Sequence, residues 1–124
     1  MNHLRYAILP LLLISMLLMS SCSIIGRLVG DIDYLPEGEY VGSYESPDGR
    51  YTINIFLFNG GATVDYCIRG ELIENTDEAD VKKNIYWNYH EETAKVEWES
   101  DTVVVINGHR LDVSEKETYD WRHN

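Results

Sequence analysis

The sequence is poor in cysteine and in basic residues, and both shortages limit what the protein can be. Cys22 and Cys67 are the only cysteines among 124 residues, so a disulfide framework cannot hold the fold together. Ten lysine and arginine residues stand against 21 aspartate and glutamate residues, which gives a formal net charge of −11. An acidic surface repels the phosphates of nucleic acid, although it favours solubility and cationic partners. We therefore predict no nucleic-acid partner.

Long apolar runs are also missing, apart from one stretch near the N-terminus. Ala7–Met19 is uncharged, but its about 13 residues fall short of the ~20 that a membrane-spanning helix needs. Arg5 precedes this run, and the small residues Ser20 and Ser21 follow it. A basic start, a short apolar segment and small residues before a cleavage point are typical of a secretory signal peptide. A signal peptide is therefore predicted over residues 1–21.

The end of this leader resembles the lipobox of bacterial lipoproteins. Ser20, Ser21 and Cys22 match the pattern, whereas Met19 stands where leucine is more common. The resemblance implies that the Cys22 thiol receives a diacylglycerol and that this residue becomes the mature N-terminus. Two acyl chains give stable membrane attachment without a spanning helix. An uncleaved membrane anchor and ordinary secretion without lipid remain as alternatives.

The lipid attachment predicts a protein held on the extracytoplasmic face of the cell membrane. Residues 22–37 form the expected lipidated N-terminus and tether, since Gly26, Gly30 and Pro36 interrupt their apolar residues. Residues 38–124 form the expected folded domain. Cys67 lies in an apolar-rich segment, where a free thiol most often acts as a small buried hydrophobe. A redox or pairing role for it is the alternative.

The folded part has the pattern of an all-β domain. Short segments of alternating apolar and polar residues are separated by turn-forming residues, and no helix is predicted. Such a pattern favours an antiparallel meander that forms a small barrel or sandwich, without parallel crossovers. The tail, Glu117–Trp121, is expected to be an edge strand or an aromatic plug. The other expected strands are Tyr40–Glu45, Tyr51–Phe58, Ala62–Ile73, Ile85–Tyr89 and Ala94–Trp98, and Gly70 indicates a bulge or bend in the third.

The strongest local signal is a hairpin over Thr102–Val113. Asn107-Gly108 is the preferred pair for a type I′ turn, and β-branched residues flank it. A two-residue loop pairs Ile106 with His109 and Val104 with Leu111. The apolar side chains of both arms then share one face.

The motifs for metal binding and catalysis are incomplete. His90-Glu91-Glu92 starts like a helical zinc-protease motif, but Ala94 stands where its second histidine is required. No serine lies in a Gly-x-Ser-x-Gly elbow. We therefore predict neither a metal site nor a cofactor. A non-enzymatic binding module is the favoured hypothesis, ahead of an enzyme. The rival hypothesis is a small envelope hydrolase or carbohydrate-active enzyme that uses Asp65 and His109.

Aromatic residues gather late in the chain, and most are expected to be core. Trp87 and Tyr89 share one face of their strand, so Tyr86 must lie on the other. A partly exposed aromatic patch could bind an envelope protein, a peptide or a glycan. The predicted interaction surface consists of Arg69, Tyr86, Asn88, His90 and Trp121.

Several sequence blocks resemble a family of small lipoproteins from Bacillus and its relatives, catalogued as a domain of unknown function. The blocks are SPDGRYT from Ser46, NGGATV from Asn59, IRGEL from Ile68, KKNIYWNY from Lys82, INGHRLDV from Ile106 and YDWR from Tyr119. The resemblance implies envelope attachment and supplies no catalytic residue. Cys67 is a departure from it, which argues against a shared thiol chemistry.

Overall fold

The computed structural model describes residues 31–62, 64–76 and 78–124. The chain divides into two compact units, Met1–Tyr34 and Leu35–Asn124. The predicted signal peptide and Cys22 lie outside the described residues. Within the described part of the chain, no helix is both long and apolar enough to cross a membrane.

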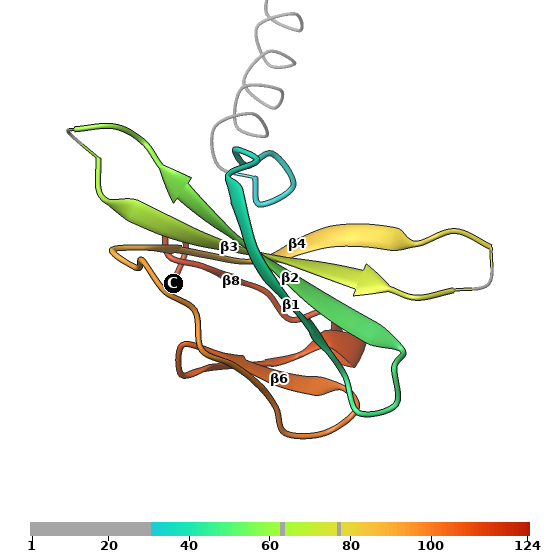
Figure 1. Ribbon diagram of the computed structural model, residues 1–124. Coiled ribbons are helices and arrows are strands. Elements are labelled where there is room, and N and C mark those ends of the chain that lie inside the picture. Colours follow the sequence, from blue (N-terminus) through green and yellow to red (C-terminus); the bar gives the residue numbers. More distant parts are fainter. Residues whose placement is uncertain (1–30, 63, 77) are drawn as a thin grey trace, which may run out of the picture. The chain divides into compact units, whose positions relative to one another are not determined.

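The second unit is built from two β-sheets (Figure 1). The larger sheet has the strand order β1-β2-β3-β4-β8, and the smaller has the order β5-β6-β7. The strands are β1 (Glu39–Glu45), β2 (Tyr51–Asn59), β3 (Tyr66–Glu74), β4 (Val81–Tyr89), β5 (Val96–Trp98), β6 (Val103–Ile106), β7 (His109–Asp112) and β8 (Tyr119–Asp120), with a short 3-10 helix η1 (Val113–Glu115) before β8.

One apolar core lies between the two sheets, as in a small sandwich. Alternation in β2 directs every second side chain inward, and the smaller sheet covers that inner face of the larger one. The prediction of an all-β fold is therefore confirmed. The buried members of the core are Tyr51, Ile53, Ile55, Ile68, Ile85, Tyr86, Val104, Ile106, Leu111 and Val113.

The hairpin of β6 and β7 has the predicted register. Ile106 pairs with His109, and Val104 pairs with Leu111. Asn107 and Gly108 have φ angles of 48° and 84°, as a type I′ turn requires. The turn sequence and the apolar alternation therefore agree on one structure.

A β-bulge interrupts the pairing of β3 with β4. The register shifts between Gly70 and Glu71, because Gly70 pairs with Tyr86 while Glu71 pairs with Asn84. Ile85 is the extra residue, so both Ile85 and Tyr86 are buried in the core. The predicted irregularity at Gly70 is confirmed, and it reverses the alternation of β4.

Two details of the predicted topology are wrong. The third strand starts at Tyr66 instead of Ala62, because Asn59, Gly60 and Gly61 begin a turn in which the Gly61 amide donates to the Asn59 side chain over 3.1 Å. The last strand, β8, pairs with β4 in parallel. The small sheet lies between them in sequence and supplies the long connection that such a crossover needs.

Candidate functional site

Aromatic rings gather where the end of β4 meets the residues after β8. The Trp121 amide donates to the Trp87 carbonyl oxygen over 3.1 Å, which holds Trp121 beside β4. The Tyr89 ring stacks on Trp121 with centroids 5.2 Å apart, and it contacts the His90 ring at 3.8 Å. Trp121 is 40% exposed, and His90 is exposed as well. We call Tyr89, His90 and Trp121 the aromatic surface.

A carboxylate fixes one end of the aromatic surface. Asp65 Oδ2 lies 2.6 Å from His90 Nδ1, and the Asp65 amide donates to the Tyr89 hydroxyl over 3.3 Å. The hydrogen bond with His90, followed by one from the Tyr66 amide, lowers the pKa of Asp65 below its ordinary value. His90 itself has a φ angle of 63°, in the left-handed region that most side chains avoid. The aromatic surface is therefore a locally specified arrangement with an acidic neighbour.

Tyr86 does not belong to an exposed surface, and its predicted place there is wrong. The bulge at Ile85 turns Tyr86 into the core, where it is 0% exposed. Its hydroxyl donates to Glu91 Oε1 over 2.5 Å and accepts from the Asn88 amide group over 3.3 Å. Burial, followed by the hydrogen bond with Glu91, raises the pKa of Tyr86 far above its ordinary value. Asn88 is half-buried and serves this internal hydroxyl.

Arg69 is also buried, at 5% exposure, so its predicted exposure is wrong too. It lies on the outer face of the larger sheet, where its Nε and Nη2 donate to the Glu37 carbonyl oxygen over 3.3 and 2.7 Å. Its Nη1 donates to Asn84 Oδ1 over 2.8 Å, and its guanidinium lies 3.9 Å from the Phe56 ring centroid. Arg69 thus attaches the start of the second unit to the sheet.

The residues of the rival enzyme hypothesis have other partners. His109 stacks on Tyr119 at 3.9 Å and packs against Tyr86, while Asp65 is bonded to His90. The structure gives no hydrogen bond or ion pair between Asp65 and His109 within the described ranges. No group of three or more metal-ligating side chains occurs there either.

Cys67 is buried at 3% exposure, as predicted for a small hydrophobe. Burial, followed by the negative charge of Asp65, raises the pKa of its thiol. The reactive thiolate is therefore disfavoured at this position.

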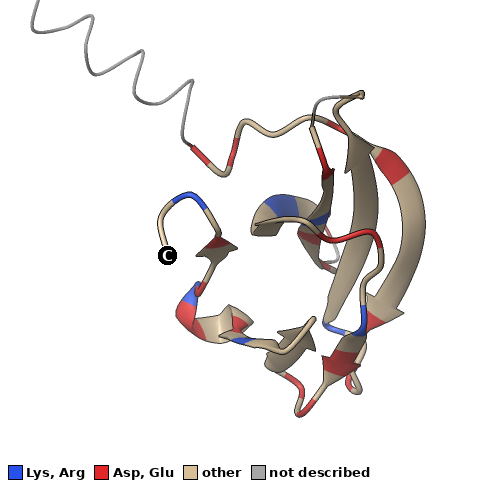
Figure 2. Cartoon of the chain, turned by 90° about the vertical axis from the view of Figure 1, so that its left-hand side faces the viewer, with Lys and Arg blue, Asp and Glu red and all other residues tan. Residues whose placement is uncertain are grey.

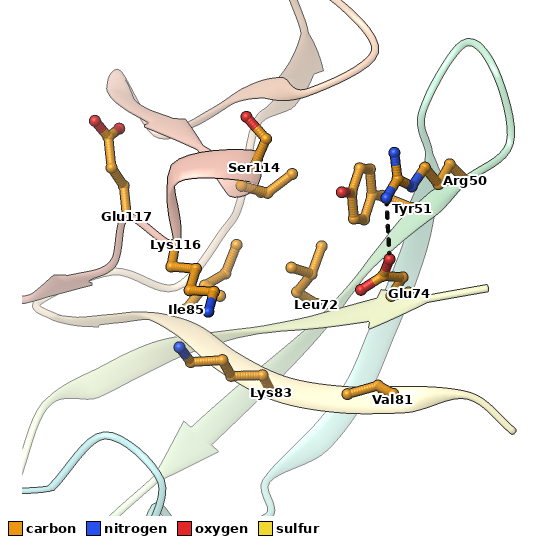
Figure 3. Close-up of a pocket in the computed structure, with 11 residues that line it drawn as sticks. Arg50, Tyr51, Leu72, Glu74, Val81, Lys83, Ile85, Ser114, Lys116 and Glu117 are labelled. Carbon is orange, nitrogen blue, oxygen red and sulfur yellow. Dashed lines mark hydrogen bonds and ion pairs between the residues drawn. The ribbon is translucent and has the colours of Figure 1, made fainter. Parts of the chain in front are cut away.

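A pocket that the sequence did not reveal opens at the inner face of the larger sheet (Figure 3). Its volume is about 420 Å³. Apolar side chains form part of the wall, and the charged residues include three cations and two carboxylates. The lining residues are Arg50, Tyr51, Leu72, Glu74, Val81, Lys83, Ile85, Val113, Ser114, Lys116 and Glu117. The sequence offers only a weak indication of this pocket. Strand alternation places Lys83 on the same face as Ile85, but it does not indicate which other segments meet there.

The family comparison matches almost the whole sequence. Residues 5–124 match the model of a family of unknown function, DUF5412. The chain belongs to this family. The match includes the strands that carry the aromatic surface and the pocket, so both sites lie within the family domain.

One curated relative is similar over part of the chain. Internalin C of Listeria monocytogenes serotype 1/2a (strain EGD / Mackaness) is 36% identical over 63 residues. These residues are 51% of this chain and 21% of Internalin C, so the match spans about a fifth of that protein. No solved structure matches the chain significantly.

Proposed function

We propose that the protein is a lipid-anchored, non-enzymatic binding module of the cell envelope. Diacylated Cys22 holds it on the extracytoplasmic face of the cell membrane, and the β domain captures an envelope protein or glycan. The lipobox-like sequence before Cys22 supports the anchor. The exposed aromatic surface supports the binding role.

The stacking of Trp121 on Tyr89 is the observation that carries the binding role. Trp121 keeps 40% of its surface exposed although its backbone is bonded to β4. An aromatic ring held in place offers contact area to a partner at low entropic cost. Tryptophan and tyrosine are also the residues that most often dominate binding energy at protein interfaces.

Crosslinking of the full chain in native cells tests the binding role. We expect Trp121→Ala to reduce the recovery of a specific envelope component by about tenfold or more. Tyr40→Ala is the matched control, since Tyr40 is a 58% exposed aromatic residue on β1, the opposite edge strand of the sheet. Equal recovery with both variants would refute the aromatic surface as the binding site.

Mass spectrometry tests the anchor separately. We expect the mature protein to begin at Cys22 with a diacylglycerol on the thiol, and Cys22→Ser to release the protein from membranes. An unmodified Cys22 in a membrane-bound protein would refute the lipid anchor and leave the binding test intact.

A further inference from the structure

The pocket on the inner face contains an unusual share of the basic residues in this acidic chain. The sequence has four lysines, Lys82, Lys83, Lys95 and Lys116, and two of them line the pocket. Figure 2 shows carboxylates spread over many elements, with lysine and arginine confined to a few short segments. The pocket is therefore a local exception to the charge of the whole chain.

Strand pairing brings Lys83 to the pocket. Lys83 pairs with Leu72 of β3, which packs against the core, so Lys83 is on the inner face of the sheet. Lys116 follows η1 directly and is its C-cap residue. In Figure 3 the amino ends of Lys83 and Lys116 point toward the same part of the pocket.

The carboxylates of the pocket are already engaged. Glu74 Oε1 pairs with Arg50 Nη2 at 3.3 Å, and Glu117 Oε2 accepts the Asp112 amide over 2.8 Å. Among the residues described, no carboxylate forms an ion pair with Lys83 or Lys116. Two like charges thus share one pocket without an acidic partner, an arrangement that a bound anion would relieve.

Apolar side chains and Ser114 form the rest of the wall. Tyr51, Ile85 and Val113 belong to the buried core, and Leu72 packs against it. Figure 3 shows Tyr51, Leu72 and Ile85 at the pocket among the charged residues, and Val113 lines it as well. A volume of about 420 Å³ is in the range of small-molecule sites, which combine apolar walls with a few polar groups.

We propose that this pocket binds an organic anion, in which a carboxylate or phosphate group meets Lys83 and Lys116 while an apolar body contacts Leu72, Ile85 and Val113. The net charge of the chain does not prevent this, because at physiological ionic strength charges beyond about 8 Å are largely screened. Lys83 and Lys116 are the positive charges that line the pocket and have no carboxylate partner among the described residues. The ligand is either a soluble small molecule or the headgroup of an anionic lipid.

Calorimetric titration of the full chain in phosphatidylcholine nanodiscs tests the proposal. Phenyl phosphate and hexanoate are the anionic probes, and benzyl alcohol is the neutral one. We expect the anions to bind more tightly than benzyl alcohol and to bind more weakly as salt rises. Equal affinity for benzyl alcohol and phenyl phosphate would overturn the anion site.

Two double variants with the same net charge locate the site. We expect Lys83→Gln with Lys116→Gln to lower the affinity for phenyl phosphate about tenfold or more, a loss of about 1.4 kcal/mol. Lys82→Gln with Lys95→Gln is the matched control and should change the affinity less than about twofold, since neither of these lysines lines the pocket. An equal loss in both double variants would overturn the pocket as the site. Thermal unfolding confirms that each variant is folded.

Nanodiscs that contain phosphatidylglycerol distinguish a lipid headgroup from a soluble small molecule as the ligand. If the ligand is a lipid headgroup, phosphatidylglycerol competes with phenyl phosphate, and Lys83→Gln with Lys116→Gln abolishes the competition. If the ligand is soluble, phenyl phosphate binds equally in both kinds of nanodisc. The proposal fails if no anionic probe binds in either, and this failure leaves the aromatic surface unaffected.

Discussion

Two cationic sites on β3 and β4 show opposite uses of positive charge in an acidic chain. On the outer face, Arg69 is buried and bonded to Glu37 and Asn84. On the inner face, Lys83 is exposed beside a pocket and has no carboxylate partner among the described residues. The bonded cation supports the fold, whereas the cation without a carboxylate partner belongs to the anion site that we propose.

The largest expected effect on stability follows from removing the buried cation. Arg69→Ala removes the hydrogen bonds to the Glu37 carbonyl and the largely buried ion pair with the Glu71 carboxylate, so we expect the free energy of unfolding to fall by about 3 kcal/mol. Lys83→Ala should change it by less than about 0.5 kcal/mol, because the side chain is solvated. Urea unfolding followed by tryptophan fluorescence measures both. Similar losses in the two variants would remove the distinction between the sites.

The bulge between the two sites provides the next test. A Cβ atom at Gly70 would lie 2.9 Å from the Tyr86 Cβ, so Gly70→Ala forces the two strands apart. We expect a loss of about 2 kcal/mol, as for other overpacked cores. Gly42→Ala in β1 is the control, since its nearest contact would be an ordinary 3.6 Å. A loss in Gly70→Ala no larger than in Gly42→Ala would show that the close approach is unimportant.

How far the sequence could predict these features depends on the range of the interactions. The β6–β7 hairpin follows from Asn107-Gly108 and its neighbours, so its register was predictable. The burial of Tyr86 depends on one extra residue, Ile85, and strand alternation cannot reveal such an insertion. The strand nevertheless includes the predicted residues Ile85–Tyr89, because a bulge leaves the rest of the ladder in place, but it starts earlier than predicted, at Val81.

The two cationic sites depend on contacts between distant segments. Arg69 is buried because the Glu37 carbonyl, 32 residues earlier in the chain, accepts its hydrogen bonds. The pocket brings Lys83 and Lys116 together from different elements. Of the residues in the predicted interaction surface, His90 and Trp121 are exposed. Both contact the Tyr89 ring, although His90 and Trp121 are far apart in the sequence.

A smaller effect is the pH dependence of stability that comes from Asp120, the residue before Trp121. Burial tends to raise the pKa of Asp120, but the hydrogen bonds and charge of Arg122 outweigh it and lower the pKa below its ordinary value of 3.8. A lowered pKa in the folded state contributes stability above the unfolded pKa, and this contribution is lost as the pH falls through the folded pKa. We expect the wild type to lose stability relative to Asp120→Asn below about pH 4. A constant difference between the two proteins from pH 6 to pH 2 would contradict this role.

Lysine-selective NMR of the unmutated full chain tests most directly the claim that the unpaired lysines serve a ligand. The four lysine side chains report separately when phenyl phosphate is titrated into the protein in phosphatidylcholine nanodiscs. We expect the signals of Lys83 and Lys116 to shift together and saturate, while those of Lys82 and Lys95 stay in place. Equal shifts at all four lysines, or none at Lys83 and Lys116, would contradict the claim.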